Sequence, residues 1–110
     1  MTIHDLIQAI WAVDPVTATN RMTFEAIGLT AESGELLNQL KKHRFYRGQD
    51  RTDQMLDELC DVYYHLNALC QVFGITREEL ERLTVEKHSQ SLEKLRQEKI
   101  QSENKQSSRR

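Results

Sequence analysis

Four carboxylates are spaced so that they could meet and hold a divalent cation. Glu32 and Glu35 lie three residues apart in one segment with helical periodicity, and Glu58 and Asp61 lie three residues apart in another. At about 3.6 residues per turn, each pair falls on one flank of the apolar stripe of its helix. The two flanks have the same hand, so they lie on the same side if the two helices run antiparallel. We therefore expect the four acids to converge on one side of a helical hairpin.

The chemistry expected of this set is metal binding. Each pair alone is typical of a solvated helix face, because 29% of the residues are charged, but two pairs with matched flank, hand and depth are less expected by chance. Acids held together repel one another at the edge of a core, and a hard divalent cation offsets that repulsion. Mg²⁺ prefers oxygen ligands, and Mn²⁺ can substitute for it. The predicted metal ligands are Glu32, Glu35, Glu58 and Asp61.

A ferritin-like di-iron site is excluded by inspection. Such a site requires Glu-x-x-His on two helices. In this chain Asp61 follows Glu58 by three residues, and Asn38 follows Glu35 by three.

Four segments with helical spacing supply the scaffold for the acids. They cover residues 2–13, 23–42 and 53–73, and a fourth begins at a capping box formed by Thr76 and Glu79. Residues 17–22 are predicted to form a connector. The loop at residues 44–52 is short, which favours an antiparallel arrangement of the two helices that carry the acids.

Composition limits the fold and function classes. The chain has 110 residues, one proline and four glycines, which allows one domain and argues against a turn-rich β-fold. A net charge of −2 and an aromatic content of 6% argue against general nucleic-acid binding. We expect an all-α, four-helix bundle protomer over residues 1–100, with an antiparallel central hairpin and a disordered polar tail at 101–110. Its thin core favours association with further copies of the chain.

The predicted location is the cytoplasm. No basic segment followed by an apolar run opens the chain, and no apolar run is long enough to cross a membrane. Cys60 and Cys70 cannot form a disulfide framework, and both are expected to be buried thiols.

Two stretches, GLTAESGELLNQLKK and DELCDVYYHLNALCQVFGI, resemble the MazG-like all-α nucleoside triphosphate pyrophosphohydrolases. That superfamily includes dimeric dUTPases and phosphoribosyl-ATP pyrophosphohydrolases, and its signature is EExxE, a spacer and ExxD. Glu32 and Glu35 match the second and third acids of the first half, and Glu58 and Asp61 match the second half. The 22-residue spacer between them fits, and the resemblance covers residues 6–91.

The resemblance implies a Mg²⁺-dependent hydrolase. It would convert a nucleoside or deoxynucleoside triphosphate and water to the monophosphate and diphosphate, by attack of a metal-activated water on the α-phosphorus. The catalytic residues that the resemblance implies are the same four acids, Glu32, Glu35, Glu58 and Asp61. The expected substrate is dGTP or GTP, with dUTP or dCTP as further possibilities. A homodimer or homotetramer is also implied, and Lys87 matches a family lysine that faces the phosphates.

Two positions depart from the family pattern. Ala31 stands where the first acid of EExxE is expected, and Ser91 stands where the last helix usually carries an asparagine. Any role of the first acid as a base is therefore in question. The alternative function is a non-catalytic helical dimerisation or regulatory module whose acidic edge docks a basic partner.

Several weaker signals keep two interpretations each. Lys87 either extends from the core edge or reaches a phosphate. His65 is either an outer partner of the acids or a surface histidine. Trp11 and Phe24 either pack or sandwich a base. The basic cluster at residues 41–51 either complements a helix end or contacts phosphates.

Overall fold

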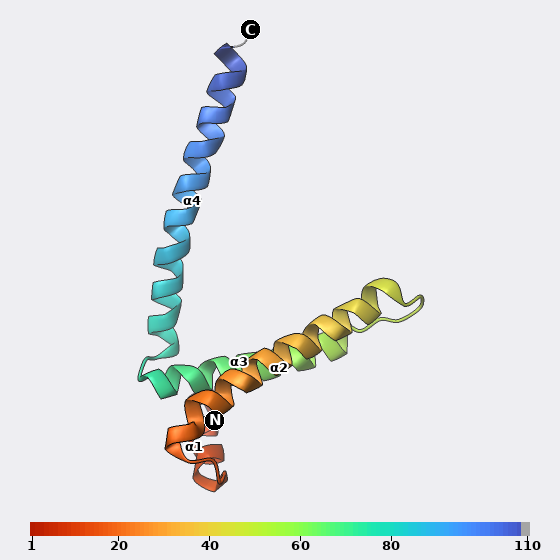
Figure 1. Cartoon of the computed structure of the whole chain (residues 1–110), viewed down its shortest axis with the longest axis vertical. Coiled ribbons are helices and arrows are strands. Elements are labelled where there is room, and N and C mark those ends of the chain that lie inside the picture. The colour runs from red at the N-terminus through yellow and green to blue at the C-terminus, as the bar shows by residue number, and fades with distance from the viewer. Residues whose placement is uncertain (109–110) are drawn as a thin grey trace. The chain divides into compact units, whose positions relative to one another are not determined.

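The chain folds into four α-helices, and residues 1–108 contain no strand (Figure 1). The computed structural model describes the backbone of residues 1–108, and the side chains of these residues except 18, 19, 107 and 108. The helices are α1 (Ile3–Val13), α2 (Ala18–Phe45), α3 (Thr52–Phe73) and α4 (Arg77–Ser108). The predicted all-α class is confirmed.

The central element is an antiparallel hairpin of α2 and α3, which pack along each other (Figure 1). The hairpin that was expected to carry the acids is therefore present. α2 is longer than predicted at its start. It begins at Ala18, so residues 18–22 continue the helix and do not form the expected connector.

Helix α1 begins and ends where local chemistry predicts. The Thr2 hydroxyl accepts a hydrogen bond of 3.1 Å from the backbone N–H of Asp5, which satisfies one free donor of the first turn. The helix ends at Val13, and the next residue, Asp14, has an extended backbone because Pro15 follows. α1 packs against α3, and its Ile7 is fully buried.

Helix α3 ends in a Schellman motif. Gly74 adopts a left-handed conformation with φ of 71°, which glycine enters without steric cost. The N–H of Ile75 then donates to the carbonyl of Cys70 at 3.0 Å, and the N–H of Gly74 donates to that of Gln71 at 3.2 Å. The chain divides into two units after Ile75.

The second unit is described by itself and consists of α4. The Thr76 hydroxyl accepts the N–H of Glu79 at 3.0 Å, which confirms one half of the predicted capping box. The helix continues to Ser108. The expectation of a disordered tail is therefore wrong for residues 101–108, because the helix propagates through this polar sequence; residues 109–110 lie outside the described part. The bundle arrangement of the four helices stays a prediction.

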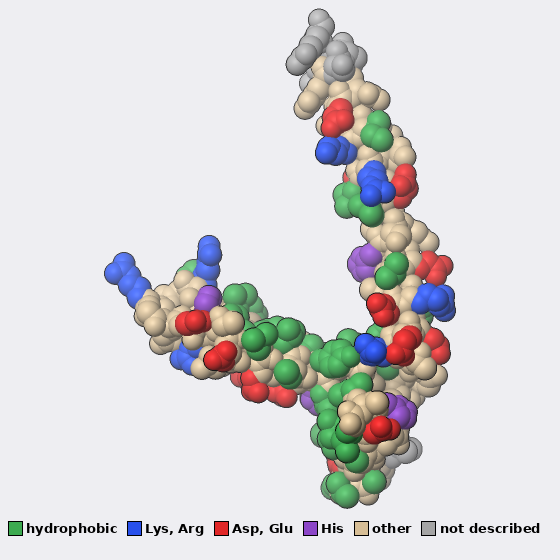
Figure 2. All heavy atoms as spheres, turned by 180° about the vertical axis from the view of Figure 1, so that it is seen from behind, with side chains coloured by type: hydrophobic (Ala, Val, Ile, Leu, Met, Phe, Trp, Pro, Cys, Tyr) green, Lys and Arg blue, Asp and Glu red, His purple; other side chains and the backbone are tan. Residues whose placement is uncertain are grey.

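Apolar burial is sparse over the part of the chain that is described. The buried apolar residues there are Ile7, Ala68 and Cys70, and burial raises the pKa of the Cys70 thiol. Cys60 is exposed, so the expectation that it is buried is wrong. Figure 2 shows hydrophobic side chains gathered along the hairpin and basic side chains at its tip. Within residues 1–108, no helix has the length and apolar character needed to cross a bilayer.

Candidate functional site

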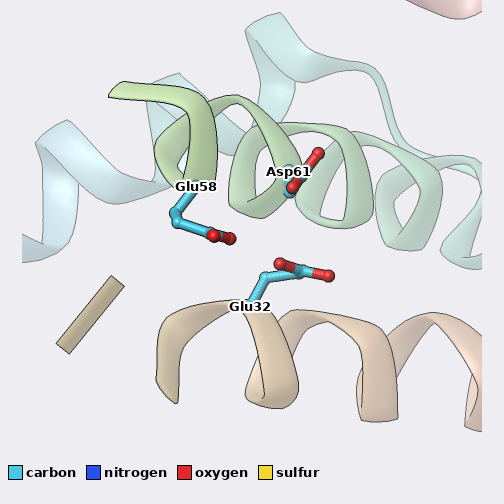
Figure 3. A group of neighbouring side chains, drawn as sticks. All are labelled: Glu32, Glu58 and Asp61. Atoms are coloured by element: carbon cyan, nitrogen blue, oxygen red, sulfur yellow. The ribbon is translucent and has the colours of Figure 1, made fainter. Parts of the chain in front are cut away.

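Three of the four predicted acids form a compact group across the hairpin. Glu32 extends from α2 towards Glu58 and Asp61 of α3 (Figure 3). One oxygen from each carboxylate lies within 4.8 Å of the other two. Glu32 and Glu58 are partly buried and Asp61 is exposed. We call these three residues the acidic triad.

The electrostatics of the acidic triad favour the binding of positive charge. The pKa of Glu58 is raised, first by a hydrogen bond with Glu32, then by burial and by the like charges around it. The pKa of Asp61 is raised, first by burial and then by the charges of Glu32 and Asp57. Repulsion between neighbouring carboxylates contributes to both shifts. A proton or a cation relieves that repulsion.

Glu35 lies at the margin of this group. It follows Glu32 by three residues on α2 and is exposed. Its charge contributes to the raised pKa of Glu58, so it lies near enough to act on the acidic triad. Its oxygens lie outside the three-residue group that could hold an ion. The predicted convergence of four acids is thus seen as three acids with a fourth beside them.

Lys87 and the two departures from the family pattern lie on helical surfaces. Ala31 is exposed on α2, directly before Glu32. Lys87 and Ser91 are exposed on α4, where the Ser91 hydroxyl donates to the carbonyl of Lys87 at 3.5 Å. Lys87 lies on α4, in the unit separate from the hairpin that carries the acids.

A buried charged residue that the sequence interpretation missed, Glu25, lies on α2. Its exposed fraction is 1%. Its Oε1 accepts a hydrogen bond of 3.3 Å from the Trp11 indole, and its Oε2 lies 2.7 Å from Nδ1 of His65. The Arg21 guanidinium lies 4.0 Å from the same carboxylate. A buried carboxylate persists in a fold only with partners of this kind.

Arg21 extends this network to the connector between α1 and α2. Its Nη1 lies 3.2 Å from Oδ2 of Asp14, and its Nη2 donates to the carbonyl of Val16 at 2.9 Å. The guanidinium also lies 4.9 Å from the ring centre of Trp11. The pKa of Asp14 is lowered, first by a hydrogen bond from the backbone N–H of Val16 and then by Arg21. We call Trp11, Asp14, Arg21, Glu25 and His65 the buried network.

The location of His65 excludes one of its two interpretations. Its side chain is 15% exposed and paired with Glu25, so the surface-histidine interpretation is wrong. It lies one turn after Asp61 on α3, and its charge opposes the upward shift of the pKa of Asp61. The signal that could have found it was spacing. Glu25 precedes Glu32 by seven residues, and His65 follows Glu58 by seven.

Trp11 takes part in packing, since its indole bonds to Glu25 and faces Arg21. Phe24 is partly exposed on α2. In the basic cluster, Nδ1 of His43 in the last turn of α2 accepts the N–H of Arg51 at 3.1 Å and lies 3.7 Å from Asp50. Part of that basic cluster therefore bonds within residues 43–51.

Comparison with protein-family models, with curated proteins and with solved structures finds no match for this chain. Its function is therefore argued from its own residues.

Proposed function

We propose that this protein is a Mg²⁺-dependent nucleoside triphosphate pyrophosphohydrolase of the MazG-like kind. The reaction is hydrolysis of a nucleoside or deoxynucleoside triphosphate to the monophosphate and diphosphate. The observation that carries the proposal is the acidic triad, in which Glu32 on one helix faces Glu58 and Asp61 on the antiparallel one. The pairing of ExxE with ExxD on two helices is the feature shared with that superfamily.

The donor set fits a hard divalent cation. All three groups offer carboxylate oxygens, which suit Mg²⁺ and Mn²⁺ and do not suit softer metals. The pKa values of Glu58 and Asp61 are raised by a hydrogen bond with Glu32 and by burial respectively, and in both cases also by neighbouring like charges, which a bound cation would offset. When bound, Mg²⁺ would neutralise part of the triphosphate charge and lower the pKa of a water ligand.

The side chains divide into two roles. Glu32, Glu58 and Asp61 hold the cation and fix its place at the edge of the hairpin. Glu35 is exposed beside them, so its carboxylate is free to complete the ligand set or to accept a proton from the attacking water. It would thereby take the role of the first acid of the EExxE signature, whose position Ala31 occupies in this chain. Lys87 is proposed to contact the substrate phosphates.

The proposed assembly is a homodimer or homotetramer of four-helix bundle protomers in the cytoplasm. Its support is the number of large apolar side chains that are exposed on α2 and α3. The proposed substrate is dGTP or GTP, followed by dUTP or dCTP.

The decisive experiment measures diphosphate release with Mg²⁺ over a panel of ribonucleoside and deoxynucleoside triphosphates. We expect turnover of at least one nucleotide and its loss on removal of the metal with a chelator. Glu58→Gln and Asp61→Asn should each reduce the rate at least about a hundredfold, because each removes a charged ligand. Glu35→Gln should lower the rate and leave Mn²⁺ binding closer to that of the wild type.

The control is Asp53→Asn, which removes an exposed acid from the first turn of α3 outside the acidic triad. It should retain the wild-type rate. Wild-type turnover in Glu58→Gln would contradict the proposed mechanism. If no nucleotide yields diphosphate while the protein folds and binds metal, the non-catalytic regulatory module becomes the better description.

A further inference from the structure

The Glu25–His65 pair and the acidic triad lie one heptad apart along the same hairpin. Glu25 and Glu32 are seven residues apart on α2, and Glu58 and His65 are seven residues apart on α3. Seven residues are close to two helical turns, or about 10 Å of rise, so such residues share a helix face. In an antiparallel pair, a contact at one level therefore recurs one heptad away. Glu25 meets His65 at one level, and Glu32 meets Glu58 at the next.

The two levels have opposite electrostatic character. At the acidic triad, carboxylate oxygens of Glu32, Glu58 and Asp61 lie within 4.8 Å of one another, so their like charges push α2 and α3 apart. At the other level, the 2.7 Å contact between Nδ1 of His65 and Oε2 of Glu25 draws the same helices together. The attraction therefore lies next to the repulsion that it offsets.

Gly28 admits the His65 ring between the helices. A Cβ atom built at Gly28 would lie 2.4 Å from Cε1 and 2.6 Å from Nδ1 of His65. Real carbon atoms do not approach so closely, so any other residue at this position would displace the ring. Glycine weakens the interior of a helix, and its presence here matches the needs of this one contact.

The Glu25 carboxylate is itself fixed in place. It is 1% exposed and held by Trp11 of α1, by Arg21 and by His65. Arg21 is fixed in turn by Asp14 and by the carbonyl of Val16. The position of the Glu25 carboxylate is therefore fixed. A slip of α3 along α2 would take away its partner on α3, His65, and leave the buried carboxylate with one hydrogen bond fewer.

We propose that Glu25, Gly28 and His65 are positioning residues that hold α3 in the register at which the acidic triad forms. This inference rests on the proposed metal centre and concerns its preorganisation. The three residues do not touch the cation. They set the place of Glu58 and Asp61 relative to Glu32, in the way that outer partners orient metal ligands.

The test measures Mn²⁺ affinity by calorimetry in the full chain. Gly28→Ala should weaken binding by about tenfold or more, because outer partners of metal ligands have effects of this size. His65→Leu places an apolar side chain at this position and removes the donor to Glu25. It should weaken Mn²⁺ binding to a similar extent. His65→Asn places an amide N–H near the position of Nδ1, and it should keep most of the affinity.

Gly34→Ala is the matched control. Gly34 lies on the same helix, two residues from Glu32, and a Cβ built there meets nothing within 4 Å. This variant should bind Mn²⁺ as the wild type does. Gly28→Ala should cause no further loss in the His65→Ala background, since the ring atoms that obstruct the new Cβ are absent there. A purely structural role for Gly28 would not predict that dependence.

Three outcomes are distinguishable. If Gly28→Ala and His65→Leu bind Mn²⁺ as tightly as Gly34→Ala, the positioning proposal is wrong and the metal centre stands. If Gly28→Ala fails to fold, as judged by circular dichroism, the pair His65→Leu and His65→Asn decides, and equal affinities overturn the proposal. If the wild type binds Mn²⁺ and yields no diphosphate from any nucleotide, the proposed enzyme is wrong while the positioning proposal is still judged by affinity.

Discussion

At the scale of single residues, the carboxyl of Glu58 interacts with every other acid of the candidate site. It shares a hydrogen bond with Glu32 and experiences the charges of Asp61 and Glu35. Its neighbour Asp61 is also harder to ionise than an ordinary aspartate. Both residues therefore bind protons more tightly in the folded chain than in the unfolded chain. This difference links the stability of the metal-free protein to pH.

The sign of that link follows from the raised pKa of Glu58, whose ordinary value is 4.5. The folded state binds the extra proton, so its contribution to stability is complete below the ordinary pKa and is lost as the pH rises through the raised one. Without metal, the unfolding temperature should therefore fall as the pH rises from mildly acidic to neutral. Thermal unfolding followed by circular dichroism measures this slope.

Glu58→Gln is the variant that isolates this effect. It should flatten the slope and raise the unfolding temperature at neutral pH, because a neutral amide ends the repulsion. Saturating Mg²⁺ should also reduce the fall of the wild-type unfolding temperature with rising pH. The lowered pKa of Asp14 acts only at more acidic pH, where its stabilising contribution is lost as the pH falls. An unchanged slope in Glu58→Gln would show that the acidic triad is not strained by charge.

At the scale of elements, the buried network joins α1 to the hairpin. Arg21 of α2 faces Trp11 of α1 and bonds to Asp14 and Val16 of the connector. Its exposed fraction is 6%, and its partner Glu25 is 1% exposed. A polar network therefore does part of the joining that apolar packing does in larger cores. Removing one member of such a network leaves the others buried without partners.

Arg21→Met tests this joint. The apolar side chain keeps much of the volume and removes all donors, so the free energy of unfolding should fall by about 3 kcal/mol or more. Arg47→Met is the control, because Arg47 is an exposed arginine of the hairpin loop, and it should change stability by less than about 0.5 kcal/mol. Urea unfolding of both variants gives the comparison. Equal stabilities would show that the network contributes little to the fold.

At the scale of the whole molecule, the hairpin of α2 and α3 carries many large apolar side chains that are exposed. Ile27 and Leu37 on α2 are 64% and 65% exposed, and Leu56 and Leu59 on α3 are 55% and 50% exposed. Soluble monomers seldom expose so many large apolar side chains along one element. A groove on α2 lined by Gly34, Leu37, Leu40 and Phe45 among others shows the same lack of a partner. Association of copies is the simplest way to cover these faces.

We therefore expect the wild type to sediment as a dimer or larger assembly at micromolar concentration. Leu37→Glu should shift the equilibrium towards the monomer, because it buries a charge without a partner in the interface. Gln54→Glu introduces the same charge at an exposed polar position of α3 and should leave the assembly intact. Analytical ultracentrifugation of the three proteins measures the result. A monomeric wild type would contradict the expectation.

The sequence by itself determined the helices, the hairpin and most of the acidic site. Helical spacing reports which residues share a face, and Gly74, Thr2 and Thr76 mark helix ends through local backbone chemistry. The matched flanks of the two acidic pairs predicted the meeting of Glu32 with Glu58 and Asp61. The helix ends depend on residues near one another in the chain. The side on which the acids meet follows from helical periodicity once the short loop makes the two helices antiparallel.

Only the tertiary structure decided the register of α3 against α2. It left Glu35 beside the acidic triad, buried Glu25 among three partners, and admitted the His65 ring over Gly28. None of these outcomes follows from helical periodicity, because each depends on how side chains from distant segments fit at one level of the hairpin. A shift of one residue along either helix preserves the pattern in the sequence and destroys these contacts.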